Sequence, residues 1–175
     1  MNRFLSPVVI VGFILASTSA FAGDLDIPLG SYGLLGFGRS PLIDQYGKKT
    51  GYLGIAVGGG YNFNPYIGVE GSINSLAEPA YEAMSLSLVA IGHIPLIKGY
   101  GIYLKSGEGY NIVTIPGINA GAAATLTGLG LVTGAGIEIT VKKEIYRFGI
   151  DHYDLAAGGF PMSTNFLNFT MVVAE

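Results

Sequence analysis

Three features of the sequence predict an all-β fold, an eight-stranded antiparallel up-and-down transmembrane β-barrel. Between residues 50 and 173, short stretches of apolar residues alternating with small or polar ones succeed one another. The connections between these stretches are alternately tight and long, the order expected when short turns lie on one side of a membrane and longer loops on the other. Only 12% of the residues are charged, whereas a soluble domain carries about 25%. This low charge indicates a surface that faces lipid.

The N-terminal segment has the pattern of a secretory signal peptide. Arg3 precedes an apolar run over residues 4–16, and a small-residue cleavage motif ends at Ala22. This pattern predicts a signal peptide over residues 1–22 that is removed after export. The remaining residues 23–175 suffice for one domain of moderate size, and we expect them to form the outer-membrane β-barrel domain.

The alternation predicts eight strands, each near or above the roughly 9 to 11 residues that a tilted strand needs to cross a bilayer. They cover residues 31–39, 51–62, 66–76, 84–94, 100–111, 123–140, 145–153 and 164–173. The tight connections are residues 62–65, 95–99 and 141–144, and the long ones are residues 40–50, 77–83, 114–122 and 154–163. We therefore expect the tight turns on the periplasmic side of the membrane.

The sixth predicted strand shows the alternation over the greatest length. Its first face is mainly apolar and carries Leu129, Leu131, Thr133, Ala135, Ile137, Ile139 and Val141. Its second face is mainly glycine, with Glu138 and Thr140. Small residues inside and apolar residues outside are typical of a narrow barrel in lipid. A soluble eight-stranded binder of the lipocalin type is the alternative, and it would place its apolar residues inside.

A transmembrane helix over residues 118–137 is a further alternative. These 20 residues carry no charge, and Lys142 and Lys143 follow them as a positive flank. Five of the 20 are glycine and three are threonine, which weakens a helix. The helix would also ignore the period-two pattern on both sides of the segment, so the sequence favours a strand.

Aromatic residues gather near the predicted strand ends in two groups. The residues are Tyr61, Phe63, Tyr66 and Tyr100 beside tight turns, and Tyr110, Tyr153 and Phe160 toward long loops. A tyrosine has an apolar ring and a polar tip, which suits the level of the lipid headgroups. The groups therefore predict the two aromatic girdles of a membrane barrel, although core tyrosines of a soluble β-sandwich are the alternative interpretation.

Five charged residues are expected to project into the lumen. They are Glu70, Lys105, Glu138, Arg147 and Asp151. The interior of an eight-stranded barrel is just wide enough for side chains to fill, so charges there must pair or be bridged by water. Three acids and two bases predict an ion-pair network that plugs the barrel, with Glu108 as a candidate for its outer end. The alternative is a conducting or gated path.

No catalytic, cofactor or metal site is predicted. His152, Asp154 and Ser163 border one long loop, but three common residue types around a loop do not define a catalytic triad, and His152 is expected to point outward. His93 is expected near a strand end and not as a metal ligand, because no second histidine or cysteine lies at ligand spacing. The chain has no cysteine, which excludes disulfides and a lipid-anchored cysteine.

Charge argues against a nucleic-acid partner. Without Arg3, eight of the nine basic residues remain against twelve acidic ones, and none of them forms a basic block. Such a mildly acidic chain offers little to a phosphate backbone.

Four segments share a pattern of glycine and aromatic residues. They are GGGYNFNPYIGVEGS at 58–72, SLSLVAIGHIPL at 85–96, YGIYLKSGEGYNI at 100–112 and TGAGIEI at 133–139. These segments resemble the OmpA-like and opacity-like porin family of outer-membrane β-barrels. The resemblance implies an eight-stranded barrel in the outer membrane of a Gram-negative bacterium. It also implies that inward charges such as Glu70, Lys105, Glu138 and Arg147 form an internal network.

These features together predict a small integral outer-membrane protein with a structural or surface-interaction role and at most a narrow pore. Expected partners are outer-membrane lipid and lipopolysaccharide, the barrel-assembly machinery during biogenesis, and extracellular molecules that contact the exposed loops. One alternative is a minor channel for ions or small solutes. Another is an enzyme that modifies lipid A. The deacylases of that kind resemble this chain in size and use a His-x-Ser pair, where this chain has His152-Tyr153-Asp154.

Overall fold

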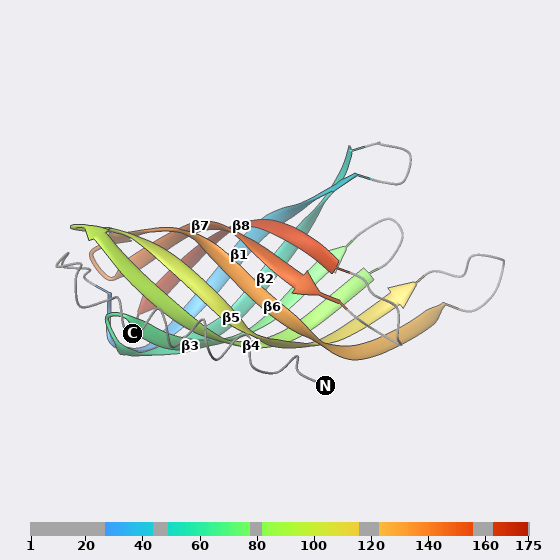
Figure 1. The fold of residues 1–175 in the computed structure, drawn as a ribbon, viewed down its shortest axis with the longest axis horizontal. Coiled ribbons are helices and arrows are strands. Elements are labelled where there is room, and N and C mark those ends of the chain that lie inside the picture. Colours follow the sequence, from blue (N-terminus) through green and yellow to red (C-terminus); the bar gives the residue numbers. More distant parts are fainter. Residues whose placement is uncertain (1–26, 44–48, 78–81, 116–122, 156–162, 175) are drawn as a thin grey trace, which may run out of the picture.

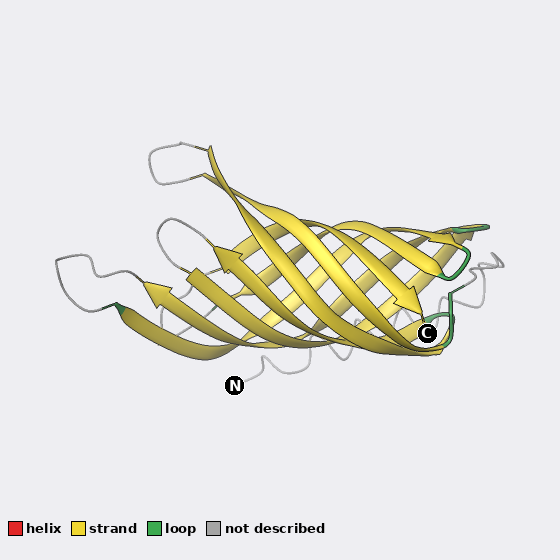
Figure 2. Ribbon diagram, turned by 180° about the vertical axis from the view of Figure 1, so that it is seen from behind, coloured by secondary structure: helices red, strands yellow, loops and turns green. Residues whose placement is uncertain are grey.

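The computed structural model describes residues 27–43, 49–77, 82–115, 123–155 and 163–174. Eight antiparallel strands form one closed barrel in chain order, and β1 pairs with β8 to close it (Figures 1 and 2). The strands are β1 (Gly30–Ile43), β2 (Lys49–Asn64), β3 (Ile67–Ala77), β4 (Glu82–Ile97), β5 (Tyr100–Ile115), β6 (Ala124–Val141), β7 (Glu144–Asp154) and β8 (Ser163–Ala174). The predicted fold class and strand order are confirmed, and most strands run a few residues beyond their predicted ends.

Of the residues 118–137 that one alternative predicted as a transmembrane helix, residues 124–137 belong to a strand instead, and residues 118–122 lie outside the described part of the chain. Strand β6 covers Ala124–Val141 and pairs with β5 on one side and β7 on the other. No helix in the described part of the chain is long and apolar enough to span a membrane.

Three two-residue turns gather at one end of the barrel, which we call the turn end (Figure 1). They are residues 65–66, 98–99 and 142–143, and the opposite end, where the longer connections leave the strands, is the loop end. In the first turn, the Asn64 side-chain oxygen accepts hydrogen bonds from the backbone N–H groups of Tyr66 and Ile67, at 2.8 and 3.0 Å. Gly99 and Lys142 adopt positive φ angles of 77° and 59° in the other two turns. The residues within each turn therefore determine its conformation.

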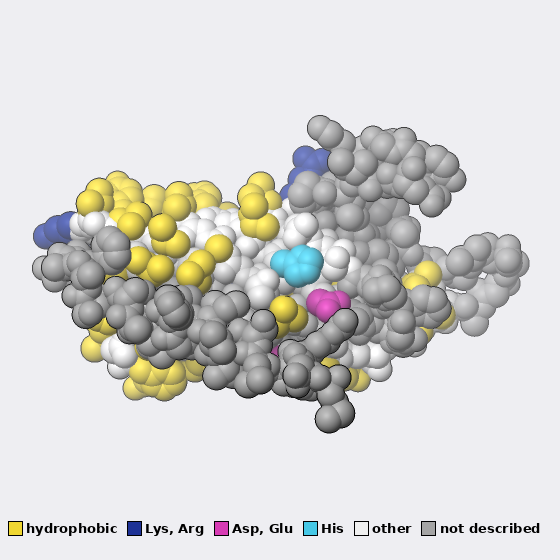
Figure 3. Space-filling view, viewed as in Figure 1, with side chains coloured by type: hydrophobic (Ala, Val, Ile, Leu, Met, Phe, Trp, Pro, Cys, Tyr) yellow, Lys and Arg dark blue, Asp and Glu magenta, His cyan; other side chains and the backbone are white. Residues whose placement is uncertain are grey.

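The outside of the barrel is apolar and the inside is small or polar. Along β4, Met84, Leu86 and Leu88 are 46%, 58% and 64% exposed, whereas the intervening Ser85 and Ser87 are 0% and 5% exposed. Figure 3 shows apolar side chains gathered over the outer wall toward the turn end. This distribution contradicts the lipocalin-type alternative, because a soluble binder would expose the polar face.

Two glycines allow large side chains to cross the narrow lumen. A Cβ atom on Gly60 would overlap the hydroxyl of Tyr32, and one on Gly149 would overlap the hydroxyl of Tyr103. Both tyrosines are buried, at 5% and 1% exposure. The inward glycines therefore make room for rings that fill the barrel.

Most of the predicted girdle residues lie on the outer wall. Tyr61, Phe63, Tyr66 and Tyr100 are exposed near the turn end, and Tyr110 is exposed toward the loop end. Tyr153 does not belong to a girdle, because it points inward and is only 2% exposed. Phe160 lies outside the described residues.

Candidate functional site

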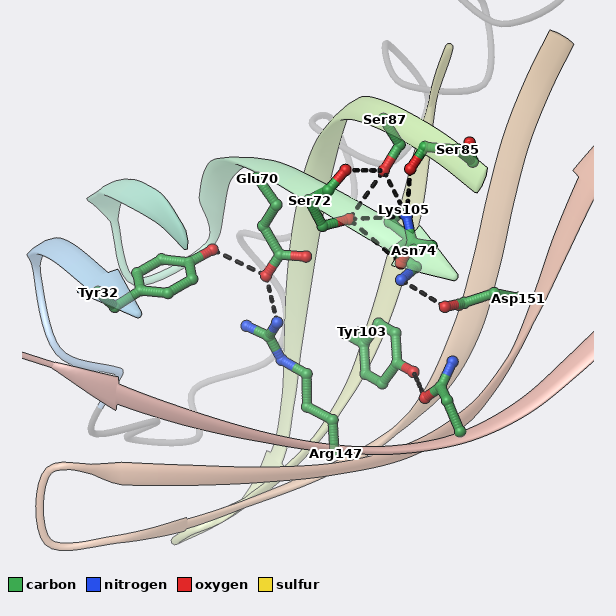
Figure 4. A network of polar contacts seen from close by, with 11 residues as sticks. Tyr32, Glu70, Ser72, Asn74, Ser85, Ser87, Tyr103, Lys105, Arg147 and Asp151 are labelled. Atoms are coloured by element: carbon green, nitrogen blue, oxygen red, sulfur yellow. Dashed lines mark hydrogen bonds and ion pairs between the residues drawn. The ribbon is translucent and has the colours of Figure 1, made fainter. Parts of the chain in front are cut away.

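Arg147 of β7 is the centre of a buried charge cluster inside the barrel. Its Nη1 atom contacts the Glu70 carboxylate from β3, and its Nε atom lies 3.5 Å from Glu138 Oε2 on the adjoining strand β6. The Tyr32 hydroxyl donates a 2.8 Å hydrogen bond to the same Glu70 (Figure 4). The guanidinium group also lies 5.9 Å and 5.5 Å from the ring centroids of Tyr32 and Tyr103. One cation is thus held by two carboxylates and two aromatic rings.

His93 extends this cluster, and the sequence reading missed it. Its Nδ1 atom lies 3.0 Å from both carboxylate oxygens of Glu138, and neither side chain has any exposed surface. From the sequence, His93 was expected near a strand end, and its inward direction was overlooked. The alternation along β4 contains that signal, because His93 shares its parity with the buried Ser85 and Ser87.

Lys105 and Asp151 form a second ion pair toward the loop end. Lys105 Nζ lies 2.6 Å from Asp151 Oδ2, and the two side chains are 16% and 4% exposed. The structure thus places all five predicted inward charges inside the barrel and divides them into two groups, one around Arg147 and one at this pair.

Uncharged polar side chains continue the layer across the barrel (Figure 4). The Asn74 amide donates a 3.1 Å hydrogen bond to Ser87 Oγ, which lies 2.8 Å from Ser72 Oγ. The Tyr103 hydroxyl donates to the Asn168 side-chain oxygen at 3.4 Å. These contacts connect β3 with β4, and β5 with β8, across or around the lumen.

A small cavity separates the charged groups. Its volume is about 20 Å³, and its lining includes Glu70, Lys105, Arg147, Asp151 and Asn168. Arg147 Nη2, Asp151 Oδ1 and Asn168 Nδ2 are buried and have no hydrogen-bond partner among the described residues. A volume of this size holds about one water molecule, which fits these donors and this acceptor.

Apolar clusters lie on both sides of the charged layer. The cluster at the turn end consists of Ile27, Tyr32, Leu34, Ile145 and Val172. The cluster at the loop end consists of Ala83, Val89, Val113, Val132, Tyr153, Leu155 and Phe166. The residues just before β1 are held at the turn end, where the Asn62 amide donates a 3.0 Å hydrogen bond to the Pro28 carbonyl. The described lumen is therefore filled in three layers, apolar, charged and apolar.

The other residues considered from the sequence lie on the outer wall. Glu108 is exposed and faces outward. The expectation that it joins the outer end of the inner network is therefore wrong. His152 faces outward, because its neighbours Asp151 and Tyr153 both point inward. Its Nδ1 atom is 2.9 Å from Asn165 Oδ1 on β8. Asp154 and Ser163 pair in the strand register two residues further toward the loop end.

A closed eight-stranded barrel with an apolar outer wall, short turns at one end and ion pairs within is an outer-membrane β-barrel. A family model described as the outer membrane protein beta-barrel domain matches residues 8–173, and the chain belongs to this family. Its membership places it in the outer membrane of a Gram-negative bacterium. The match begins inside the predicted signal peptide, whose removal stays a prediction.

Solved structures support the fold. The chain is similar to Neisserial surface protein A, with a TM-score of 0.68 and 14% identity, covering 82% of this chain and 96% of that one. It is also similar to the N-terminal barrel of Pseudomonas aeruginosa OprF, with a TM-score of 0.61 and 15% identity over 83% and 97% of the two chains. For Ail of Yersinia pestis the TM-score is 0.55 and the identity 16%, over 83% and 98%. No curated protein sequence matches the chain.

Proposed function

We propose that this chain is a closed structural barrel that presents its loop end to other molecules at the cell surface. The proposal rests on the filling of the lumen, in which a charged layer lies between two apolar clusters. Loops tolerate variation while a rigid barrel holds them, so a filled barrel suits a scaffold for surface contacts.

The energetics of the charged layer disfavour a pore. A continuous water path would have to part Arg147 from Glu70 and Glu138, whose side chains are nearly or fully buried. Leaving one member of such a buried pair without its partner costs about 3–5 kcal/mol. The minor-channel alternative gains no support from a cavity of about 20 Å³.

We also infer that the chain is not an enzyme. A Ser/His/Asp site requires the histidine within hydrogen-bond reach of the nucleophile. His152 instead contacts Asn165, and Ser163 faces Asp154 in the strand register. The described residues contain no cluster of three or more His, Cys, Asp or Glu that could hold a metal. We expect an unchanged lipid A profile when the protein is overexpressed.

The proposed partners follow from the two kinds of surface. The apolar wall supports contact with outer-membrane lipid and lipopolysaccharide, and insertion of such a wall calls for the barrel-assembly machinery during biogenesis. Extracellular molecules are proposed to contact the loop end.

Single-channel recording in planar bilayers tests this function. The protein is compared with Glu138→Gln, which alters the charged layer, and with Thr133→Ala, a matched change on the outward face of the same strand. We expect no discrete conductance steps from any of the three. Steps in the unmodified protein that change with Glu138→Gln and not with Thr133→Ala would establish a channel and overturn the proposal.

A further inference from the structure

Two charged side chains of opposite sign interrupt the outer wall of the barrel. Arg39 of β1 and Glu108 of β5 are both exposed and form no ion pair with a described side chain. On each of the two adjoining strands, the residue opposite the charge in the strand register is an exposed leucine. Arg39 lies between Leu53 and Leu167, which are 79% and 57% exposed. Glu108 lies between Leu88 and Leu131, which are 64% and 43% exposed.

The two charges lie on opposite walls. The barrel is closed and its eight strands follow chain order, so β1 and β5 are four strands apart in either direction. A single molecule therefore cannot bring Arg39 and Glu108 together.

The strand register places the two charges at the same level along the barrel axis. From Gly38, one neighbour of Arg39, the row of paired residues runs in one direction through Gly54, Leu76 and Ala83 to Val113. In the other direction it runs through Asn168, Gly149 and Gly136 to Tyr103.

The two ends of this row lie on β5 and differ by ten residues, from Tyr103 to Val113. Because strands in a barrel tilt regularly, the residue level with Gly38 on the opposite wall is midway between them, at Glu108. Arg39 is the next residue along β1. At about 3.3 Å per residue and a tilt of about 40°, Arg39 and Glu108 differ in level by only about 2.5 Å.

This level lies near the loop-side edge of the apolar band: on the wall that carries Glu108, the exposed Leu86, Tyr110 and Leu129 lie one outward row further toward the loop end. Phe63, near the turn end, lies ten residues from Leu53 along β2, which corresponds to about 25 Å along the axis. The apolar band of a membrane barrel is about 25 Å tall. Leu53 pairs with Arg39, so both charges lie just inside the rim of the band and not in solvent.

Lipid alone does not suit both charges. The phosphates of lipopolysaccharide would bind Arg39 and repel Glu108. A second copy of this chain, inserted in the same orientation, carries the complementary charge at the matching level for each of them.

We propose that copies of this barrel associate side by side in the membrane, with Arg39 of one copy against Glu108 of the next. The order of strands around the barrel then places Leu167 beside Leu131 of the neighbouring copy and Leu53 beside its Leu88. Because the two surfaces lie on opposite walls, the contact is head-to-tail and generates an open row, not a two-fold dimer.

Resonance energy transfer between labelled copies tests this association. The chain has no cysteine, so Lys143→Cys in an exposed turn provides a single labelling site far from both charges. Donor- and acceptor-labelled copies are mixed at low density in vesicles of phospholipid alone, which removes lipopolysaccharide as a bridge. We expect transfer in the parent protein, and at least a twofold reduction in either Arg39→Glu or Glu108→Arg.

A mixture of the Arg39→Glu and Glu108→Arg proteins should regain transfer, because their complementary charges again face one another. Lys98→Glu, a charge reversal in a turn, is the matched control and should behave like the parent. Folding of each variant is checked by its heat-dependent mobility in gels. Absence of transfer in the parent, parental transfer in both single variants, or failure of the folded mixture to regain transfer would each overturn the proposal.

Discussion

Replacing Arg147 by methionine is expected to destabilise the folded barrel by about 3–5 kcal/mol. The change removes the cation between Glu70 and Glu138, which are 5% and 0% exposed. Glu70 keeps the hydroxyl of Tyr32, and Glu138 keeps His93, but neither acid keeps an ion pair with a lysine or arginine, because Lys105 pairs with Asp151. Methionine fills much of the volume of arginine, so the loss reports mainly on charge and not on a new cavity.

Urea unfolding of the barrel refolded in lipid vesicles measures this loss. The chain has no tryptophan, so far-ultraviolet circular dichroism and heat-dependent gel mobility are suitable signals. Phe148→Met is the matched control, because it changes the next residue of β7, which is 47% exposed on the outer wall. It should cost less than about 1.5 kcal/mol.

A third variant separates charge from packing. Combining Arg147→Met with Glu70→Gln and Glu138→Gln removes the uncompensated acids and should recover most of the lost stability, because replacing a whole buried ion cluster is often near neutral. An Arg147→Met protein no less stable than Phe148→Met would show that the cation does not stabilise the two acids. A combined variant no more stable than Arg147→Met alone would show that the loss does not come from uncompensated charge.

Two further predictions use the same unfolding assay. His93→Leu removes the 3.0 Å contact with the Glu138 carboxylate and should cost about 1.5–3 kcal/mol, the range for a hydrogen bond to a charged group; an unchanged unfolding midpoint would show that the contact contributes nothing. Gly149→Ala places a Cβ against the Tyr103 hydroxyl, whereas Gly33→Ala meets no atom within 4 Å. The first should cost about 1–3 kcal/mol through overpacking and the second much less, and equal costs would contradict the packing of Tyr103.

The alternation of the sequence was sufficient to predict the barrel. A period of two assigns each residue to the inner or the outer face, and along β6 it correctly separated Leu129 and Leu131 from Gly130 and Glu138. The same rule directed all five predicted charges inward. The assignment of Glu108 to the inner network was wrong because it did not follow this rule: Glu108 has the opposite parity to the inward Lys105 and is exposed on the outer wall.

Partners across the lumen could not be predicted from the sequence. The period gives the face of a residue but not its depth or the strand opposite, which depend on the ten-residue offset around the barrel. The contact of His93 with Glu138, the cluster that Tyr153 joins at the loop end and the position of Ile27 at the turn end all require that register. The inward direction of Tyr153, in contrast, follows from its parity with Asp151, and its assignment to a girdle overlooked that parity.

Thiol accessibility tests whether the lumen of the folded barrel is closed to water. Ser87→Cys places a thiol at a position that is 5% exposed in the polar layer, and Lys143→Cys places one in an exposed turn. In the folded protein, a membrane-impermeant maleimide should label Lys143→Cys fully and leave Ser87→Cys unlabelled from either side until the barrel is heated. Labelling of Ser87→Cys in the folded barrel at a rate near that of Lys143→Cys would show a water-filled lumen and contradict the closed barrel.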